Sequence, residues 1–350
     1  MASTVLHLWP FNMLEASATG NLVCTLNPDN VVQPFTHRET CTQSCIWSIV
    51  CMRSAAVAVL AIAIAPGLAA QEAGTAQQNG TGPEPPQVRH VTAVYPLDGV
   101  TTANDEALIV DRNLPGLWKF QLGEGSPEGE VFVQGSPQYR KPINSPRCVA
   151  VGPGGEIYLG DTATREIYRV ADDGSTTPLT GGLIGVPVDL VADSKGTLYI
   201  ADLERRAVWR WNPSGGGKPE VWLPRVNARG LAVDSQDRLW VLSQNAAQLL
   251  RYSADGAETV IVGERVFNFP HNVSVDSKGV AWVSDGYAKT VWKVEEGKPP
   301  VRAVDSPLLQ NPVGLFWHEG RLAIVDPHAA AVFRLSEDGS QIEPWFEIQK

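Results

Sequence analysis

The sequence predicts an all-β fold, a six-bladed β-propeller with four antiparallel strands per blade, over residues 88–350. Three observations predict it: a repeat of about 41 residues, two residue positions that recur at fixed offsets within it, and Asp–Gly turns between short alternating strands. The chain also contains 32 glycines, 26 prolines and 11 tryptophans, as expected for many short strands and turns.

The repeat is marked by short apolar strands that end in aspartate in five of six units. These ends are Asp111, Asp161, Asp202, Ser243, Asp285 and Asp326, and from Asp161 onward they are 41, 41, 42 and 41 residues apart. The first step is 50 residues, with the extra length in the Gly/Pro-rich stretch "GSPQYRKPINSP". A cation follows each end eight residues later: Lys119, Arg169, Arg210, Arg251, Lys293 and Arg334.

The third unit shows the four strands of one blade. "VDLVAD" is followed by a Ser-Lys-Gly turn, "TLYIAD", a short connection, "AVWRW", a Gly-rich turn and "PEVWLP". Alternation with period two is typical of half-buried strands, and turns such as "DSKG" and "DDGS" supply the Asp and Gly that tight corners require. The unit therefore predicts four antiparallel strands.

The blades are expected to pack in a ring, because a single blade cannot bury both of its faces. The aromatic residues expected between neighbouring blades are Tyr158, Tyr199, Trp240 and Trp282. The segment Val88–Tyr95 is left over, and we expect it to add an outer strand to the last blade.

The order of features within a unit resembles the NHL repeat. A proline and two residues precede an apolar strand, then come Asp-x-x-Gly, an apolar-aromatic strand ending in Asp, and an apolar-basic strand. The resemblance implies an NHL-type propeller. NHL propellers also form extracellular sensor parts of bacterial receptor kinases, so the resemblance implies a binding role as well.

The N-terminal region is interpreted as a targeting segment. Residues 1–51 show no sustained period and hold four of the five cysteines, so we interpret them as an over-extended start, with translation beginning at Met52, or as an unstructured extension. Residues 52–70, with Arg53 and an apolar run from Ala55 to Ala70, predict a signal peptide. Residues 71–87 predict a flexible linker. The alternative is a genuine extension with an internal membrane anchor.

These segments predict an exported protein, periplasmic or extracellular, that meets a membrane only through an uncleaved signal segment. The net charge of −10 argues against nucleic acid and anionic membranes as partners, since both attract basic surfaces.

Two rows of residues are expected to meet at one mouth of the central channel. The first row is Asp98, Arg147, Val188, Arg229, His271 and Val313, and the second is Gly99, Cys148, Asp189, Gly230, Asn272 and Gly314. Both rows vary from blade to blade, as binding sites do. By contrast, the recurring Asp row is expected to cap turns, the basic row to support the scaffold, and Cys148 to pack in the interior.

The polar members of these rows predict a binding site without a cofactor. The ligand-binding residues expected are Asp98, Arg147, Asp189, Arg229, His271 and Asn272. Two arginines with histidine and carboxylates suit a small anionic or sugar-like ligand, a peptide or a glycan. A protein partner at the rim is another interpretation. The bland alternative is a polar plug in which Arg147 and Arg229 pair with Asp98 and Asp189.

An enzymatic alternative comes from the stretch "FPHNVSVDSKGVAWVSDGY", which resembles blades of the peptide-amidating lyase. The resemblance implies His271 as a zinc ligand and Tyr287 as a catalytic tyrosine. That lyase uses histidines from three blades, and the equivalent positions here carry other residues. Gluconolactonase-type propellers hold a divalent metal with Glu, Asn and Asp; Asp98 and Asn272 match two of these, although neither row contains glutamate. No metal is expected, but if one is present its ligands would be His271, Asn272 and Asp98. We therefore expect a non-catalytic protein, with a metal-dependent lyase or lactonase as the alternative.

Overall fold

The structure is a computed structural model that describes residues 6–8, 12–16, 22–25, 93–123, 125–336, 339 and 341–349. The expected signal peptide, linker and start at Met52 lie outside these residues and stay predictions. None of the described helices is long and apolar enough to cross a membrane.

The fold prediction is confirmed: six sheets of four antiparallel strands form a propeller. The first strands of the blades are β4 (Pro96–Thr101), β8 (Pro146–Val151), β12 (Pro187–Ala192), β16 (Ala228–Val233), β20 (Pro270–Val275) and β24 (Gly314–His318). The second strands are β5 (Glu106–Asp111), β9 (Ile157–Asp161), β13 (Leu198–Asp202), β17 (Leu239–Ser243), β21 (Ala281–Asp285) and β25 (Arg321–Asp326). The third strands are β6 (Gly116–Gln121), β10 (Glu166–Val170), β14 (Ala207–Trp211), β18 (Leu249–Tyr252), β22 (Thr290–Val294) and β26 (Ala331–Leu335). The fourth strands are β7 (Gly129–Gln134), β11 (Thr176–Pro178), β15 (Glu220–Pro224), β19 (Glu258–Val262), β23 (Val301–Asp305) and β27 (Ile342–Glu347).

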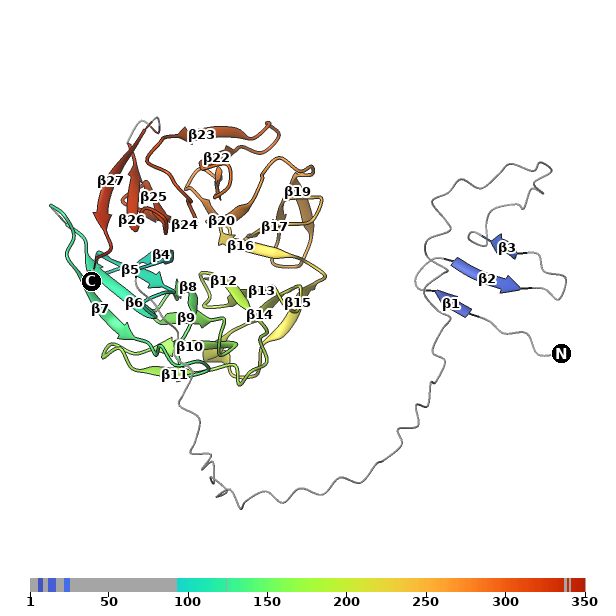
Figure 1. Cartoon of the computed structure of the whole chain (residues 1–350), viewed down its shortest axis with the longest axis horizontal. Coiled ribbons are helices and arrows are strands. Elements are labelled where there is room, and N and C mark those ends of the chain that lie inside the picture. The colour runs from blue at the N-terminus through green and yellow to red at the C-terminus, as the bar shows by residue number, and fades with distance from the viewer. Residues whose placement is uncertain are drawn as a thin grey trace, which may run out of the picture. The chain divides into compact units, whose positions relative to one another are not determined.

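The first strands surround the centre of the ring, and each contacts the first strands of the two neighbouring blades (Figure 1). A short 3-10 helix, η2 (Pro213–Gly215), lies between β14 and β15. A separate unit in residues 1–79 contains β1 (Leu6–Leu8), β2 (Asn12–Ala16) and β3 (Leu22–Thr25), which form a three-stranded antiparallel sheet. The sequence pattern did not predict these three strands.

Hydrophobic clusters fill the space between neighbouring blades. Tyr199 of β13, for example, lies in one cluster with Leu231 and Val241 of the next blade. The aromatic residues expected between blades are all buried in such clusters: Tyr158, Tyr199, Trp240 and Trp282. This packing is what allows blades that are individually unstable to form one folded domain.

The ring closes between the sixth and first blades through side chains. Phe120 of the first blade packs on Phe346 of the sixth, with ring centroids 4.4 Å apart. The expected outer strand from Val88–Tyr95 is absent as far as the structure describes this segment, because residues 93–95 form no strand and residues 88–92 are not described. The sixth sheet takes its four strands, β24 to β27, from residues 314–347.

The strand-ending aspartates cap turns, as expected. Asp285 is fully buried and accepts hydrogen bonds from the backbone amides of Asn268, Phe269 and Ala288, and from the indole of Trp292. The same pattern of accepted amides recurs at Asp111, Asp161, Asp202 and Asp326. These carboxylates are therefore used by the scaffold.

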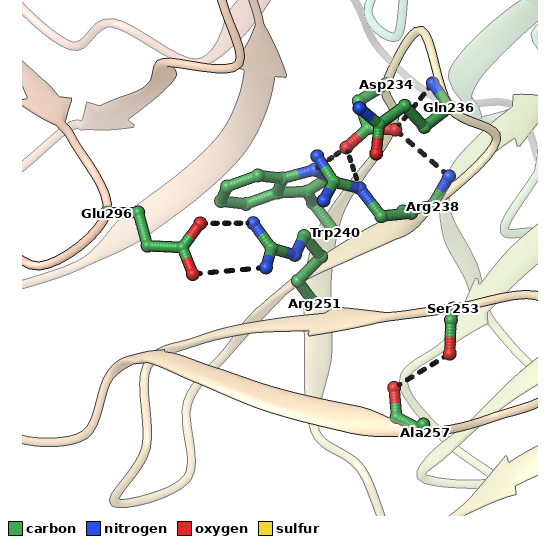
Figure 2. Close-up of polar contacts among 8 residues, drawn as sticks. All are labelled: Asp234, Gln236, Arg238, Trp240, Arg251, Ser253, Ala257 and Glu296. Carbon is green, nitrogen blue, oxygen red and sulfur yellow. Dashed lines mark hydrogen bonds and ion pairs between the residues drawn. The ribbon is translucent and has the colours of Figure 1, made fainter.

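The basic row joins neighbouring elements. In Figure 2, Arg251 of β18 forms a two-pronged ion pair with Glu296 of the fifth blade, with N–O distances of 2.7 and 3.2 Å. The same guanidinium lies 5.3 Å from the ring centroid of Trp240. Trp240 in turn donates through its indole to Asp234 at 2.9 Å. Arg251 thus belongs to the contact between the fourth and fifth blades.

Candidate functional site at the channel mouth

The first strands begin, and the second strands end, on the same face of the propeller because neighbouring strands are antiparallel. We call this the mouth face and the opposite one the turn face.

One predicted position needs correction. Asp98 was expected level with Arg147, but it pairs with Val110 just as Cys148 pairs with Gly160. Asp98 stands two residues after Pro96, as Cys148 stands two residues after Pro146, so it belongs to the second row, level with Cys148 and Asp189.

Arg147 and Arg229 begin the first strands of the second and fourth blades. Among the described residues, no carboxylate oxygen lies within 4.0 Å of either guanidinium, so neither arginine forms an ion pair there. The direct ion pairs of the polar-plug alternative are not formed among these residues, although the charges of Asp98 and Asp189 still act on Arg147 and oppose the lowering of its pKa. Instead, the Arg229 guanidinium lies 5.2 Å from the ring centroid of Phe269, and its buried Nε has no hydrogen-bond partner.

The arginines lie in one another's electric field. Burial is the main cause that lowers the pKa of Arg229, and the charge of Arg147 lowers it further. Burial likewise lowers the pKa of Arg147; the nearby charge of Arg112 adds to this effect, whereas the charges of Asp98 and Asp189 oppose it. Arg112, which directly follows the capping residue Asp111, was not among the predicted site residues. Like charges gathered at low dielectric raise the free energy of the empty site, so an anion placed there would lower it.

His271 lies beside the arginines and is held by aromatic and backbone neighbours. Its ring meets that of Phe269 edge-on at 5.0 Å, and its buried Nδ1 has no hydrogen-bond partner in the described part of the chain. Burial, followed by the charges of Arg147 and Arg229, lowers the pKa of His271 to about 3. The imidazole is therefore neutral at physiological pH.

An aromatic wall extends from the arginines to the outer surface. Tyr287 stacks on Phe269 with ring centroids 4.6 Å apart and an interplanar angle of 19°. Tyr287 is 73% exposed, so its outer ring face is open to solvent. The predicted residue Tyr287 is thus near His271 through Phe269, a residue that the sequence analysis did not single out although it precedes Pro270 and His271.

The two carboxylates of the second row serve neighbouring strands. Asp98 Oδ2 accepts from the backbone amide of Val149 at 3.0 Å, and Asp189 Oδ2 accepts from that of Leu231 at 2.6 Å. The side-chain amide of Asn272 also donates to Asp189 Oδ2, at 3.3 Å. Each carboxylate therefore ties its own blade to the next one.

Burial shapes the charge of this carboxyl pair. Burial raises the pKa of Asp98 from 3.8 to about 6, against hydrogen bonds from Val149 and Gly99 and the charge of Arg147. Burial, and then the charge of Asp98, hold the pKa of Asp189 well above its usual value. The pair therefore offsets less of the arginines' positive charge than two exposed aspartates would.

Cys148 lies between these carboxylates and is fully buried, as expected for a packing residue. Its Sγ lies 2.5 Å from the position that a Cβ on Gly160 would occupy, so glycine is required opposite it. Burial raises the pKa of the Cys148 thiol well above its usual value.

Two of the three residues of the metal hypothesis, Asp98 and Asn272, are engaged in hydrogen bonds with other groups. No hydrogen bond or ion pair of the described residues joins Asp98 to His271 or Asn272, because Asp98 is bonded to Val149 and Asn272 to Asp189. Among the residues that the structure describes, no three His, Cys, Asp or Glu side chains come together in a way that could hold a metal ion.

Comparison with known proteins supports the fold. No protein-family profile and no curated protein sequence matches this chain. Solved structures match at low identity. Virginiamycin B lyase from Staphylococcus aureus is 14% identical over 73% of this chain and 85% of its own, with a TM-score of 0.53. A structure of a nidogen/laminin complex is 14% identical over 73% of this chain and 94% of its own, with a TM-score of 0.58.

A gluconolactonase from Xanthomonas campestris is 15% identical over 70% of this chain and 92% of its own, with a TM-score of 0.55. At such identities the likeness concerns architecture and not chemistry. The chain is therefore similar to two enzymes and to a protein of a binding complex in its fold, and it is itself a six-bladed β-propeller with four antiparallel strands in each blade.

Proposed function

We propose that this propeller binds a small anionic ligand at its mouth face and does not catalyse a reaction there. The observation that supports this most directly is the pair Arg147 and Arg229, two half-buried guanidiniums without a carboxylate partner in the described residues. A guanidinium in such surroundings is partly dehydrated, and it can donate hydrogen bonds to the oxygens of an incoming carboxylate or phosphate.

The aromatic wall adds an apolar surface beside the charge. The Arg229 guanidinium lies over the ring of Phe269, and Tyr287 stacks on the same phenylalanine and is exposed to solvent. A ligand with an acidic group and a flat apolar or sugar ring could contact both the arginines and Tyr287. A glycan, a peptide with an acidic end or a protein partner presenting such a group would all meet this description.

Export completes the proposal. The segment 52–70 has the pattern of a signal peptide, so we place the propeller in the periplasm or outside the cell, as an NHL-type binding module.

The proposal is tested by isothermal titration of the full-length protein with citrate and benzoate. We expect at least one of these anions to bind with 1:1 stoichiometry, and Arg147→Gln or Arg229→Gln to weaken it at least tenfold. Arg169→Gln, which removes an exposed arginine near the turn-face end of β10, is the matched control and should change little. If no anion binds, or if all three variants behave alike, the anion site is refuted.

A metal-dependent lyase or lactonase is the second candidate. It is favoured by the neutral His271 ring, whose buried Nδ1 has no partner in the described part of the chain, and by its nearness to Tyr287 through Phe269. A neutral imidazole could bind a divalent metal or accept a proton. Metal analysis of the purified protein and of His271→Ala decides this point. Stoichiometric metal that is lost in the variant would replace the binding proposal with the enzymatic one.

A further inference from the structure

A second candidate site lies on the turn face, away from the arginines. A cavity of about 450 Å³ opens there between the third and fourth blades. It is bordered by the turn after β12, by the end of β14 and the start of β15, and by Ala254 of the next blade. Its volume is within the range of about 300–1,000 Å³ that small-molecule sites occupy.

A departure from the repeat leaves polar atoms free in this cavity. In the fourth and fifth blades a turn aspartate accepts a hydrogen bond from the tryptophan six residues later: Asp234 from Trp240 at 2.9 Å, and Asp276 from Trp282 at 3.5 Å. In the third blade the corresponding aromatic residue is Tyr199, which is 5% exposed. Its hydroxyl makes no hydrogen bond within the described residues.

The partner aspartate of the third blade is likewise incompletely used. Asp193 accepts the amides of Lys195 and Thr197 on Oδ1, at 2.9 and 2.8 Å, which caps the turn. Its Oδ2 accepts no hydrogen bond in the described part of the chain. The equivalent Oδ2 atoms of Asp234 and Asp276 each accept a hydrogen bond from a tryptophan indole N–H. Tyr199 and Asp193 therefore leave one donor and one acceptor at the same cavity.

Positive charge completes the lining. Lys195 and Lys218 border the cavity, and neither amine has a carboxylate oxygen within 4.0 Å among the described residues. Arg210 also borders it, but it is paired with Glu220 at 2.7 Å. Trp211 adds an aromatic surface. The cavity thus offers two unpaired cations, a free hydroxyl, a free carboxylate oxygen and an aromatic ring.

We propose that this cavity binds an acidic sugar, a hexose-sized ring that carries a carboxylate or a phosphate. Lys195 and Lys218 would neutralise the acidic group. Asp193 and Tyr199 would exchange hydrogen bonds with ring hydroxyls, and Trp211 would cover an apolar ring face. The proposal does not depend on the anion site of the mouth face, which lies on the opposite side of the propeller.

The test uses full-length protein that also carries Arg147→Gln and Arg229→Gln, so that anion binding at the mouth does not contribute. Titration calorimetry measures binding of glucuronate, glucose 6-phosphate, glucose and inorganic phosphate. We expect both acidic sugars to bind with 1:1 stoichiometry, and glucose and inorganic phosphate to bind at least tenfold more weakly, because each lacks one half of the recognised chemistry.

Variants of the lining then locate the site. Lys195→Gln with Lys218→Gln should weaken acidic-sugar binding at least tenfold, and Tyr199→Phe about fivefold to tenfold through one lost hydrogen bond. Matched controls are Tyr158→Phe, the equivalent tyrosine of the second blade, and Lys289→Gln, an exposed lysine in the turn that follows β21 in the fifth blade.

Four results would overturn the proposal: no binding of either acidic sugar up to about 10 mM, lining variants that bind as tightly as the controls, inorganic phosphate binding as tightly as the sugars, or glucose doing so. Tyr199→Phe removes a single oxygen atom and the lysines are exposed, so these variants keep the fold, which thermal melting verifies.

Discussion

The side-chain amide of Asn272 donates a hydrogen bond to Asp189 Oδ2 at 3.3 Å, although the two residues are 83 positions apart in sequence. The same oxygen accepts the backbone amide of Leu231 at 2.6 Å. One carboxylate therefore links the first strands of the third, fourth and fifth blades. Because Asp189 and Asn272 are both buried, neither can exchange this bond for one with water.

Asn272→Asp should destabilise the propeller at neutral pH. The substitution replaces a donor with a carboxyl beside Asp189, so one group must lose its charge or both must repel. We expect the free energy of unfolding at pH 7 to fall by about 2 kcal/mol, and by less at pH 4, where the carboxyls are protonated. Chemical denaturation at both pH values measures the difference.

Asn104→Asp, an equivalent change at an exposed position, is the control and should cost less than about 0.5 kcal/mol. Equal losses in the two variants would show that Asn272 and Asp189 are not coupled.

The dependence of stability on pH should contain two opposing contributions from the mouth. Asp98 has its pKa raised from 3.8 to about 6, so the folded state holds a proton more tightly and stability is lost as pH rises from 4 to 6. His271 has its pKa lowered from 6.5 to about 3, so the unfolded state holds a proton more tightly and stability is lost as pH falls below 6.5. Between pH 4 and 6 the two slopes have opposite signs.

Single variants should separate these slopes. Asp98→Asn, which can still accept from Val149, should make stability rise more steeply from pH 4 to 6, by up to about 1.4 kcal/mol per pH unit. His271→Gln should change the slope in the opposite direction by a similar amount. Urea denaturation at half-unit steps measures both slopes. Variants with parallel curves would contradict the assigned protonation of both residues.

The fold was predictable because each blade repeats its signals locally. Asp202 ends a strand, Arg210 follows at a fixed offset, and both positions recur in every unit or nearly so. The site was less predictable. The spacing from the strand-starting proline, Pro96 to Asp98 as Pro146 to Cys148, would have given the correct row for Asp98. Hydrogen bonds between blades leave no pattern in the sequence: the polar-plug alternative paired the carboxylates with arginines, whereas backbone amides such as that of Val149 donate to them.

Gly286 should be required for the position of His271. A Cβ on Gly286 would lie 2.2 Å from Asn311 Oδ1 and 2.9 Å from His271 Nε2. Gly286→Ala should therefore push both side chains away and lower the free energy of unfolding by about 1–3 kcal/mol. Gly215→Ala is a control, since its nearest contacts are at 3.7 Å or more. An unchanged His271 resonance in the NMR spectrum of Gly286→Ala would disprove the close contact.

The ion pair between Arg251 and Glu296 should contribute little by itself. Glu296 has a side chain that is 56% exposed, so solvent screens its charge. A double-mutant cycle with Arg251→Gln and Glu296→Gln should give a coupling of less than about 1 kcal/mol that shrinks in high salt. Arg251→Ala should cost more than Glu296→Ala, because it also removes the contact with Trp240 seen in Figure 2. Equal costs would show that this contact adds nothing.

Gln248 should stabilise the loop that joins the fourth and fifth blades. Two backbone amides of the loop between β19 and β20, those of Val266 and Phe267, donate to Gln248 Oε1 at 2.6 and 2.7 Å. Glu166 stands at the equivalent position of the second blade, five residues after the strand-ending Asp161, and it likewise accepts the backbone amides of Thr180 and Gly182. This position therefore ties the loop after the fourth strand to the third strand in both blades.

Gln248→Ala should therefore lower the free energy of unfolding by about 2–4 kcal/mol, since it leaves two buried amides without acceptors. Gln248→Glu should cost less, because a carboxylate can still accept from both amides although it loses the bond from Nε2 to the Phe267 carbonyl. Gln121→Ala, at an exposed strand end, is the control and should cost below about 1 kcal/mol. A loss at Gln248→Ala no larger than this control would mean that the loop between β19 and β20 does not depend on the glutamine.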